Sequence, residues 1–237
     1  VSAPCATAYA YRSHSGYFGI VNSEESYQNL IRFLFGDLRV DISVDVEDIR
    51  LPEDVQKEVA KNKAVNALYQ FEIQASPRGK RWYLTRRVAE EDSVACRSHI
   101  ELMDSTNDNA RSIYLSTVFL GNRWRVDQKD PSLAYSLTFG VRVPDYEVDR
   151  KFWSDAYYEG GYLFRDSVVI EIVPPQEEEG VWDINYDWQS DKLGQATTPL
   201  DPKVLKNGKA ILTIPFDSKT TPGISGKLRF VVSAWNA

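Results

Sequence analysis

The sequence predicts a mainly β protein, an antiparallel β-sandwich of about ten strands preceded by one amphipathic helix. Three observations support this prediction. From residue 38 onward, short apolar runs are separated by turn-rich segments such as SPRG and STNDN. A helical period is clear only in residues 23–35. Aromatic residues make up 12% of the 237 residues, and aromatic side chains favour strands.

Residues 23–35 carry the clearest helical pattern. Asn22 is expected to cap the helix with Glu25 as its capping-box partner, and Gly36 is expected to end it in the left-handed conformation. One face of this helix is apolar, at spacings i, i+3, i+4 and i+7: Tyr27, Leu30, Ile31 and Leu34. Such a face needs a partner surface. In this chain it is expected to be exposed, covered by the sandwich, or shared with another copy of the chain.

After Asp37 the apolar period changes from 3.6 residues to 2, which indicates a strand with one face in water. Asp41, Asp45 and Glu47 alternate with apolar residues along this strand. Several carboxylates in one region are also typical of a calcium site. The alternation assigns them more simply to the solvent face, and no metal or cofactor is predicted. Residues 52–65 fit either a short helix or a charged loop.

The rest of the chain is interpreted as strand after strand. The expected strands are 67–76, 81–88, 96–103, 112–120, 133–143, 162–173, 181–188, 209–216 and 226–235. On the third of these, His99 would share a face with Arg97 and Glu101, opposite to Cys96. That arrangement disfavours a metal site or a nucleophile–base pair built from Cys96 and His99.

Composition excludes some functions. A net charge of −6 argues against nucleic-acid binding, which needs a basic surface. No apolar run reaches the roughly 18 residues that indicate a membrane span. Cys5 and Cys96 are too few for a disulfide framework and are expected to be free thiols, which weakly favours a reducing, cytoplasmic location.

Residues 11–37 resemble the C-terminal end of bacterial α/β-hydrolases of the esterase/lipase type. The matching features are RSHSG, which contains His14, and the following GIVNSEESYQNLIRFLFGD. In that family the catalytic histidine lies on a loop after the last strand, and a final helix then packs on the sheet. The resemblance implies that His14 is the general base of a Ser-acid-His triad and that residues 23–35 are the closing helix. Residues 1–37 would be the tail of a hydrolase domain.

The other triad members are not found in this chain. No G-x-S-x-G nucleophile motif occurs, and the 13 residues before His14 are too few for a parallel sheet. We therefore expect residues 38–237 to be an accessory sandwich and this chain alone to be inactive. Residues 23–35 would contact the missing hydrolase domain or another copy of the chain, and the substrate would be a lipid or ester. The alternative is a non-enzymatic sandwich that binds lipid, glycan or a partner protein.

Overall fold

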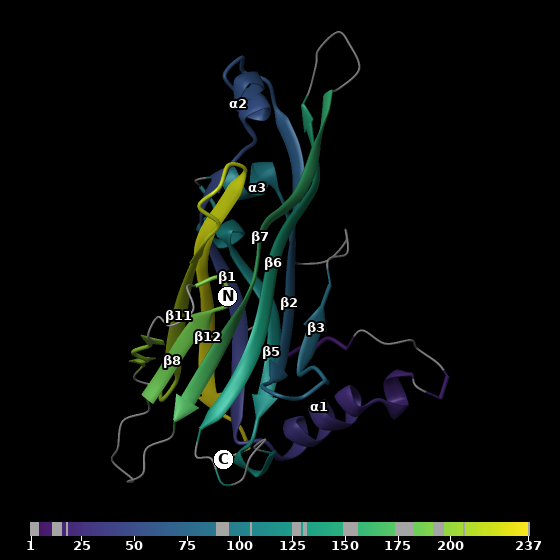
Figure 1. Cartoon of the computed structure of the whole chain (residues 1–237), viewed down its shortest axis with the longest axis vertical. Helices are drawn as coiled ribbons and strands as arrows, with labels where there is room; N and C mark the ends of the chain where they lie inside the picture. Colours follow the sequence, from purple (N-terminus) through teal and green to yellow (C-terminus); the bar gives the residue numbers. More distant parts are fainter. Residues whose placement is uncertain are drawn as a thin grey trace.

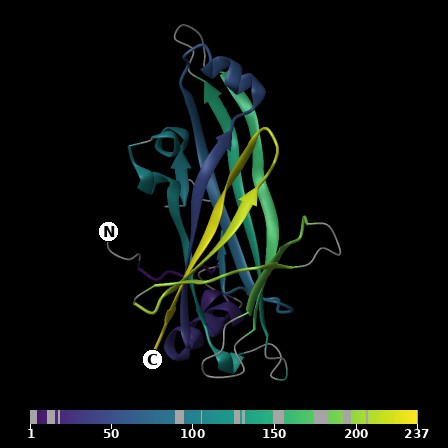
Figure 2. The ribbon, with the colours of Figure 1, turned by 90° about the vertical axis from the view of Figure 1, so that its left-hand side faces the viewer.

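The structure is a computed structural model. It describes residues 5–10, 16–17, 19–88, 95–104, 106–124, 129, 132–148, 156–173, 183–191, 197–205 and 207–236. These residues contain twelve strands in two antiparallel sheets that pack face to face (Figure 1, Figure 2). The predicted mainly β sandwich is thereby confirmed.

The first sheet has five strands in the order β10-β11-β12-β1-β5. Their bounds are β10 Lys203–Val204, β11 Ala210–Asp217, β12 Gly223–Ala234, β1 Leu38–Arg50 and β5 Ser112–Leu120. The predicted alternating strand after Asp37 is β1. It pairs with β12 on one side and β5 on the other, so the first and last long strands of the chain are neighbours.

The second sheet has seven strands, six of them in the order β3-β2-β6-β7-β8-β9, with β4 also paired to β2. Their bounds are β2 Val65–Pro77, β3 Thr85–Arg87, β4 Cys96–Ser98, β6 Leu133–Val148, β7 Ala156–Val173, β8 Asp183–Trp188 and β9 Thr198–Pro199. The β6–β7 hairpin runs the length of the molecule (Figure 1). Gly160 permits this pairing, because a Cβ there would lie 2.0 Å from the Val143 carbonyl oxygen.

The described residues also form six helices around the two sheets. They are η1 Ile20–Asn22, α1 Glu24–Phe35, α2 Glu53–Val59, α3 His99–Met103, η2 Asp108–Arg111 and η3 Asn122–Trp124. α1 and the C-terminus lie at one end, and α2 lies at the other (Figure 1). For residues 52–65 the sequence allowed a short helix or a charged loop. The structure has a short helix there, α2, and its Val55 side chain is fully buried.

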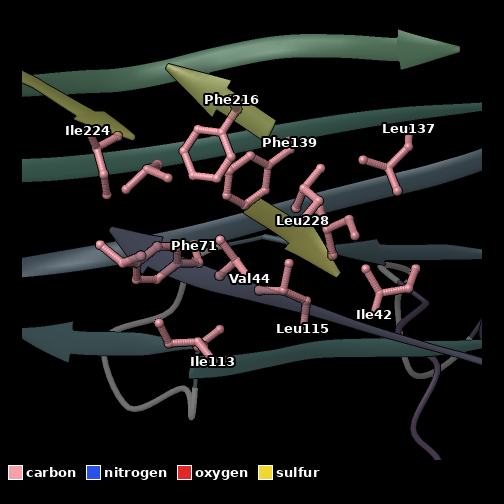
Figure 3. Close-up of a cluster of buried hydrophobic side chains, with 14 of the residues drawn as sticks. Ile42, Val44, Phe71, Ile113, Leu115, Leu137, Phe139, Phe216, Ile224 and Leu228 are labelled. Carbon is pink, nitrogen blue, oxygen red and sulfur yellow. The ribbon is translucent and has the colours of Figure 1, made fainter. Parts of the chain in front are cut away.

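The core is one continuous apolar layer between the sheets. Phe139 of β6 meets Phe216 of β11 with ring centroids 5.1 Å apart, so the two sheets touch directly at this point (Figure 3). Phe164 of β7 lies 5.0 Å from the same Phe216 ring. Aromatic contacts of this kind stabilise a core beyond the burial of their area alone.

Two predicted strands are partly wrong. Of residues 81–88, only Thr85–Arg87 form a strand, β3. Residues 96–103 form the short strand β4 and then turn into α3. The local cause is a capping box, in which Ser98 accepts from the Glu101 backbone N–H and the Glu101 carboxylate accepts from Ser98. The S-x-x-E pattern was visible in the sequence and indicates a helix start. His99 is therefore the first residue of a helix and does not share a strand face with Glu101.

The N-terminal segment 5–10 joins the sheets along one edge. The Thr117 N–H of β5 donates to the Thr7 carbonyl at 2.8 Å, and the Arg86 N–H of β3 donates to the Tyr9 carbonyl at 2.7 Å. β5 and β3 are edge strands, whose free N–H groups would otherwise be open to pairing with another chain. The segment thus closes this side of the sandwich.

We predict that Phe139→Ala lowers the free energy of unfolding by about 3–5 kcal/mol, because it removes a fully buried ring and leaves a cavity. Urea denaturation followed by circular dichroism measures the loss. Val204→Ala, at an exposed position, is the control and should change stability by less than about 0.5 kcal/mol. Equal effects of the two substitutions would contradict the assignment of Phe139 to the centre of the core.

Candidate functional site

The candidate site is the N-terminal part of the chain, where the sequence places His14 and the helix after it. His14 lies outside the described residues. The structure does describe that helix, α1, and the surface on which it lies (Figure 1). The two faces of α1 are therefore the described features that bear on the function of this region.

The helix begins and ends differently from the prediction. Its cap is Ser23, not Asn22, and the Ser23 hydroxyl accepts from the Ser26 backbone N–H at 3.2 Å. Gly36 is extended, with φ −75°, and not left-handed. A glycine is still required there, because a Cβ would lie 2.3 Å from the Arg32 carbonyl oxygen. This close approach lets the chain pass directly from α1 into the sandwich.

The polar face of α1 packs against the sandwich. Arg32 is only 3% exposed, and its guanidinium lies over the rings of Trp82 and Trp124, 4.8 and 5.3 Å from their centroids. Asn29 donates from Nδ2 to the Tyr83 carbonyl at 3.3 Å. A cation over aromatic faces is stabilised by the negative charge of the ring faces. α1 is thus held to the sandwich by polar and cation–π contacts.

The C-terminal end of the chain holds the last turn of α1. The Trp235 Nε1–H donates to the Phe33 carbonyl at 2.7 Å, and Asn236 donates from Nδ2 to the carbonyls of Phe33 and Leu34, both at 3.1 Å. The last carbonyls of a helix have no partner within it. The Phe33 ring also lies 5.3 Å from Phe119 and 5.6 Å from Trp235. These contacts fix the orientation of α1 on the sandwich.

The apolar face of α1 points into solvent. Tyr27, Leu30 and Leu34 are 58%, 56% and 48% exposed, and Phe35 is 60% exposed, while Ile31 is half-buried. The sequence allowed this face to be exposed, covered by the sandwich, or shared with another copy of the chain. In the structure of the single chain it is exposed. An amphipathic helix normally turns its apolar stripe to the core. α1 does the reverse, so its apolar face is available to a further partner.

A groove continues this apolar surface toward the N-terminus. It lies between the N-terminal segment and α1 and has a volume of about 320 Å³. Its walls include Ala6, Ala8 and Ala10 on one side and Asn29, Leu30 and Phe33 on the other. The helix face and the groove share Leu30, so they form one surface.

The second histidine has a structural partner. The Nδ1 atom of His99 lies 3.0 Å from the hydroxyl of the fully buried Tyr69. Burial lowers the pKa of His99 below its usual value, which favours the neutral imidazole. The contact holds α3 to β2.

The acidic residues of β1 form ion pairs with basic side chains of β1 itself or of the neighbouring strand β12. Asp45 accepts from Arg229 Nε and from the Ser112 hydroxyl, each at 2.7 Å. Burial alone would raise the pKa of Asp45, but hydrogen bonds from Arg229 and Ser112 bring it below its usual value. In the part of the chain that the structure describes, no three His, Cys, Asp or Glu residues are grouped to hold a metal ion.

The two cysteines are free thiols. Cys5 is exposed, Cys96 is buried, and they form no disulfide. None of the helices in the described ranges is long and apolar enough to cross a membrane. Comparison of the chain with protein-family models, with curated proteins and with solved structures found no match. The geometry of α1 is therefore the main structural argument about function.

The Tyr69–His99 pair predicts a pH dependence of stability. The folded pKa of His99 lies below the ordinary 6.5, so between the two values the unfolded chain binds more protons. The stabilising contribution is complete above pH 6.5 and is lost as the pH falls through the folded pKa. Urea denaturation should show a fall in the free energy of unfolding between pH 7.5 and 5.5, by at most about 1.4 kcal/mol per pH unit for this group.

His99→Gln is the matched variant, because it keeps a polar side chain that does not titrate. It should flatten the pH dependence over this range. An unchanged slope in His99→Gln would assign the effect to another group.

Proposed function

We propose that this chain is the C-terminal portion of a serine esterase/lipase-like α/β-hydrolase. α1 is then the closing helix of the hydrolase domain, His14 is the base of its triad, and residues 38–237 are an accessory β-sandwich. The observation that carries the proposal is the orientation of α1, whose polar face packs on the sandwich and whose apolar face is exposed.

A position between two domains would explain why the polar face of α1 is buried on the sandwich while its apolar face is exposed. A closing helix in a hydrolase covers an apolar sheet, so it needs an apolar face directed away from any appended domain. Tyr27, Leu30 and Leu34 provide that face. At roughly 25 cal/mol per Å², covering even about 200 Å² of it would contribute on the order of 5 kcal/mol. Neighbouring exposed apolar side chains of this kind mark an interaction surface.

The connection between α1 and the sandwich supports a fixed joint. Only Gly36 and Asp37 separate α1 from β1. The Asp37 N–H donates to the Leu120 carbonyl at 2.8 Å, and the Trp235 N–H donates to the Asp37 carbonyl at 2.9 Å. A hydrolase domain built on α1 would therefore be held in one orientation relative to the sandwich.

The chemistry of the proposed enzyme assigns His14 one task. A serine hydrolase needs an imidazole that takes the proton of the nucleophile and later gives it to the leaving group. The serine and the acid would come from the preceding hydrolase domain. The sandwich would act in recognition of the substrate or of a partner.

The proposal is tested in the full-length parent protein with p-nitrophenyl butyrate as substrate. His14→Ala should lower kcat by about 10³-fold or more, because the triad loses its base. His99→Ala is the control and should leave kcat unchanged, since the His99 ring is held by the buried Tyr69 of the sandwich. Normal turnover in His14→Ala would refute the assignment of His14.

A fluorophosphonate probe tests the division of the triad. It should label one serine of the parent outside residues 1–237 and none in this chain expressed alone. Stoichiometric labelling of a serine within this chain would overturn the proposal. A parent with no labelled serine would favour the non-enzymatic binding module.

The exposed helix face predicts self-association of the isolated chain. Leu30→Gln combined with Leu34→Gln should shift sedimentation velocity profiles toward monomer, because it removes apolar surface from α1. Thermal stability should change little, since both side chains are exposed. Val204→Gln, at an exposed position on β10, is the matched control and should leave association unchanged. An equal shift with Val204→Gln would deny α1 a specific role.

A further inference from the structure

An apolar cavity lies between the two sheets. It has a volume of about 70 Å³, while a single water needs roughly 10–15 Å³ of such space. Its walls come from both sheets and include Val40, Val118 and Val232 of the first sheet and Ala75, Leu137 and Ile172 of the second. No polar atom is exposed on its wall. The cavity is therefore large enough for a short stretch of hydrocarbon and offers water no hydrogen-bond partner.

The cavity lies at the α1 end of the sandwich. Val40 is near the start of β1 and Val232 near the end of β12, and the two are paired in the first sheet. Tyr135 and Ile172 line the cavity from the start of β6 and the end of β7. Figure 1 shows these strand ends at the same end of the molecule as α1 and the C-terminus.

The exposure of the side chains that line the cavity indicates at which end a ligand could enter it. Ile42, Leu84 and Leu137 are almost completely buried, whereas Tyr135 and Val232 are half-buried. The cavity is thus deepest toward the centre of the sandwich, where Ile42 and Leu137 belong to the packed layer (Figure 3). It approaches solvent at the α1 end. A linear apolar group could enter there along the strand direction.

A buried cation lies at this same end. Arg32 packs on Trp82, which borders the core two residues before the cavity residue Leu84. Burial lowers the pKa of Arg32, and electrostatic interactions with Tyr135, which lines the cavity, and with Glu24 of α1 raise it. Among the described residues, the hydrogen bonds of Arg32 go to the Gln28 carbonyl and side-chain amide, and no carboxylate forms an ion pair with it. A desolvated guanidinium favours a carboxylate partner.

We propose that the inter-sheet cavity binds the hydrocarbon tail of a free fatty acid, with Arg32 as the partner of its carboxylate. The tail fits because the cavity wall is wholly apolar. The carboxylate fits because no carboxylate of the described residues is in direct contact with the Arg32 guanidinium, and Glu24 acts on it only from a greater distance. This site goes beyond the proposed function, since it needs no hydrolase domain and uses residues of this chain alone.

The test is calorimetric titration of the 237-residue chain with dodecanoate below its micelle concentration. One site per chain is expected. Ala75→Leu fills the cavity and should weaken binding by about tenfold or more, while thermal unfolding shows that the chain still folds. Val232→Trp closes the cavity near solvent and should have the same effect.

Val231→Trp is the matched control, because the neighbouring side chain on the same strand points to the opposite face. It should change the affinity by less than about twofold. Absence of any binding by the unmodified chain would overturn the proposal. Binding that Ala75→Leu and Val232→Trp leave intact, but that Leu30→Gln with Leu34→Gln abolishes, would place the tail on α1 and also overturn it.

Dodecanol has the same hydrocarbon tail as dodecanoate but no carboxylate, so the two ligands test the cavity and Arg32 separately. Arg32→Gln should weaken dodecanoate binding by about tenfold and leave dodecanol binding within about twofold, and Arg32→Lys should restore part of the loss. Unchanged dodecanol binding also shows that the Arg32 variants keep the cavity folded. Equal losses for both ligands would refute the role of Arg32.

Phosphatidylcholine vesicles test whether the tail belongs to a membrane lipid and not to a free fatty acid. Co-flotation with vesicles should be absent in the unmodified chain. Flotation with vesicles and no binding of dodecanoate would assign the site to membrane lipid and overturn the fatty-acid proposal. None of these results depends on esterase activity, so failure here and failure of the proposed function are separate outcomes.

Discussion

The structure depends on the burial of two apolar sheet faces against each other. Each sheet has one apolar face, and the two faces leave water by packing together around contacts such as that of Phe139 with Phe216. The constraint extends to the outer faces, where alternation puts charged residues that pair across strands, as Asp45 does with Arg229. α1 and the inter-sheet cavity both lie near one end of these strands.

α1 departs from this pattern. A helix on a sandwich would ordinarily bury its apolar stripe, but α1 buries Arg32 over Trp82 and Trp124 and exposes Leu30 and Leu34. Aromatic rings and carbonyl groups at this end of the sandwich provide good partners for a polar helix face. The exposed stripe therefore remains open to a further partner.

Two apolar features lie close together at the α1 end, and they differ in kind. The face of α1 is convex and suits a surface of similar size, such as a sheet. The inter-sheet cavity is concave, enclosed by side chains such as Val40 and Leu137, and suits a narrow chain. Arg32 belongs to α1 and packs on Trp82, which borders the core. A fatty-acid site in this place would be next to the joint with the hydrolase domain that we propose.

The sequence by itself determined the mainly β class, the helix near residues 23–35 and the alternating strand β1, because these follow from local periodicity in a single segment. It also held an unused signal for α3 in Ser98 and Glu101. Only the tertiary structure decided which face of α1 is buried, that the first and last long strands pair, and that a cavity remains behind Tyr135. Each of these depends on side chains distant in the sequence, such as Arg32 with Trp82 and Trp124, whose meeting no local pattern encodes.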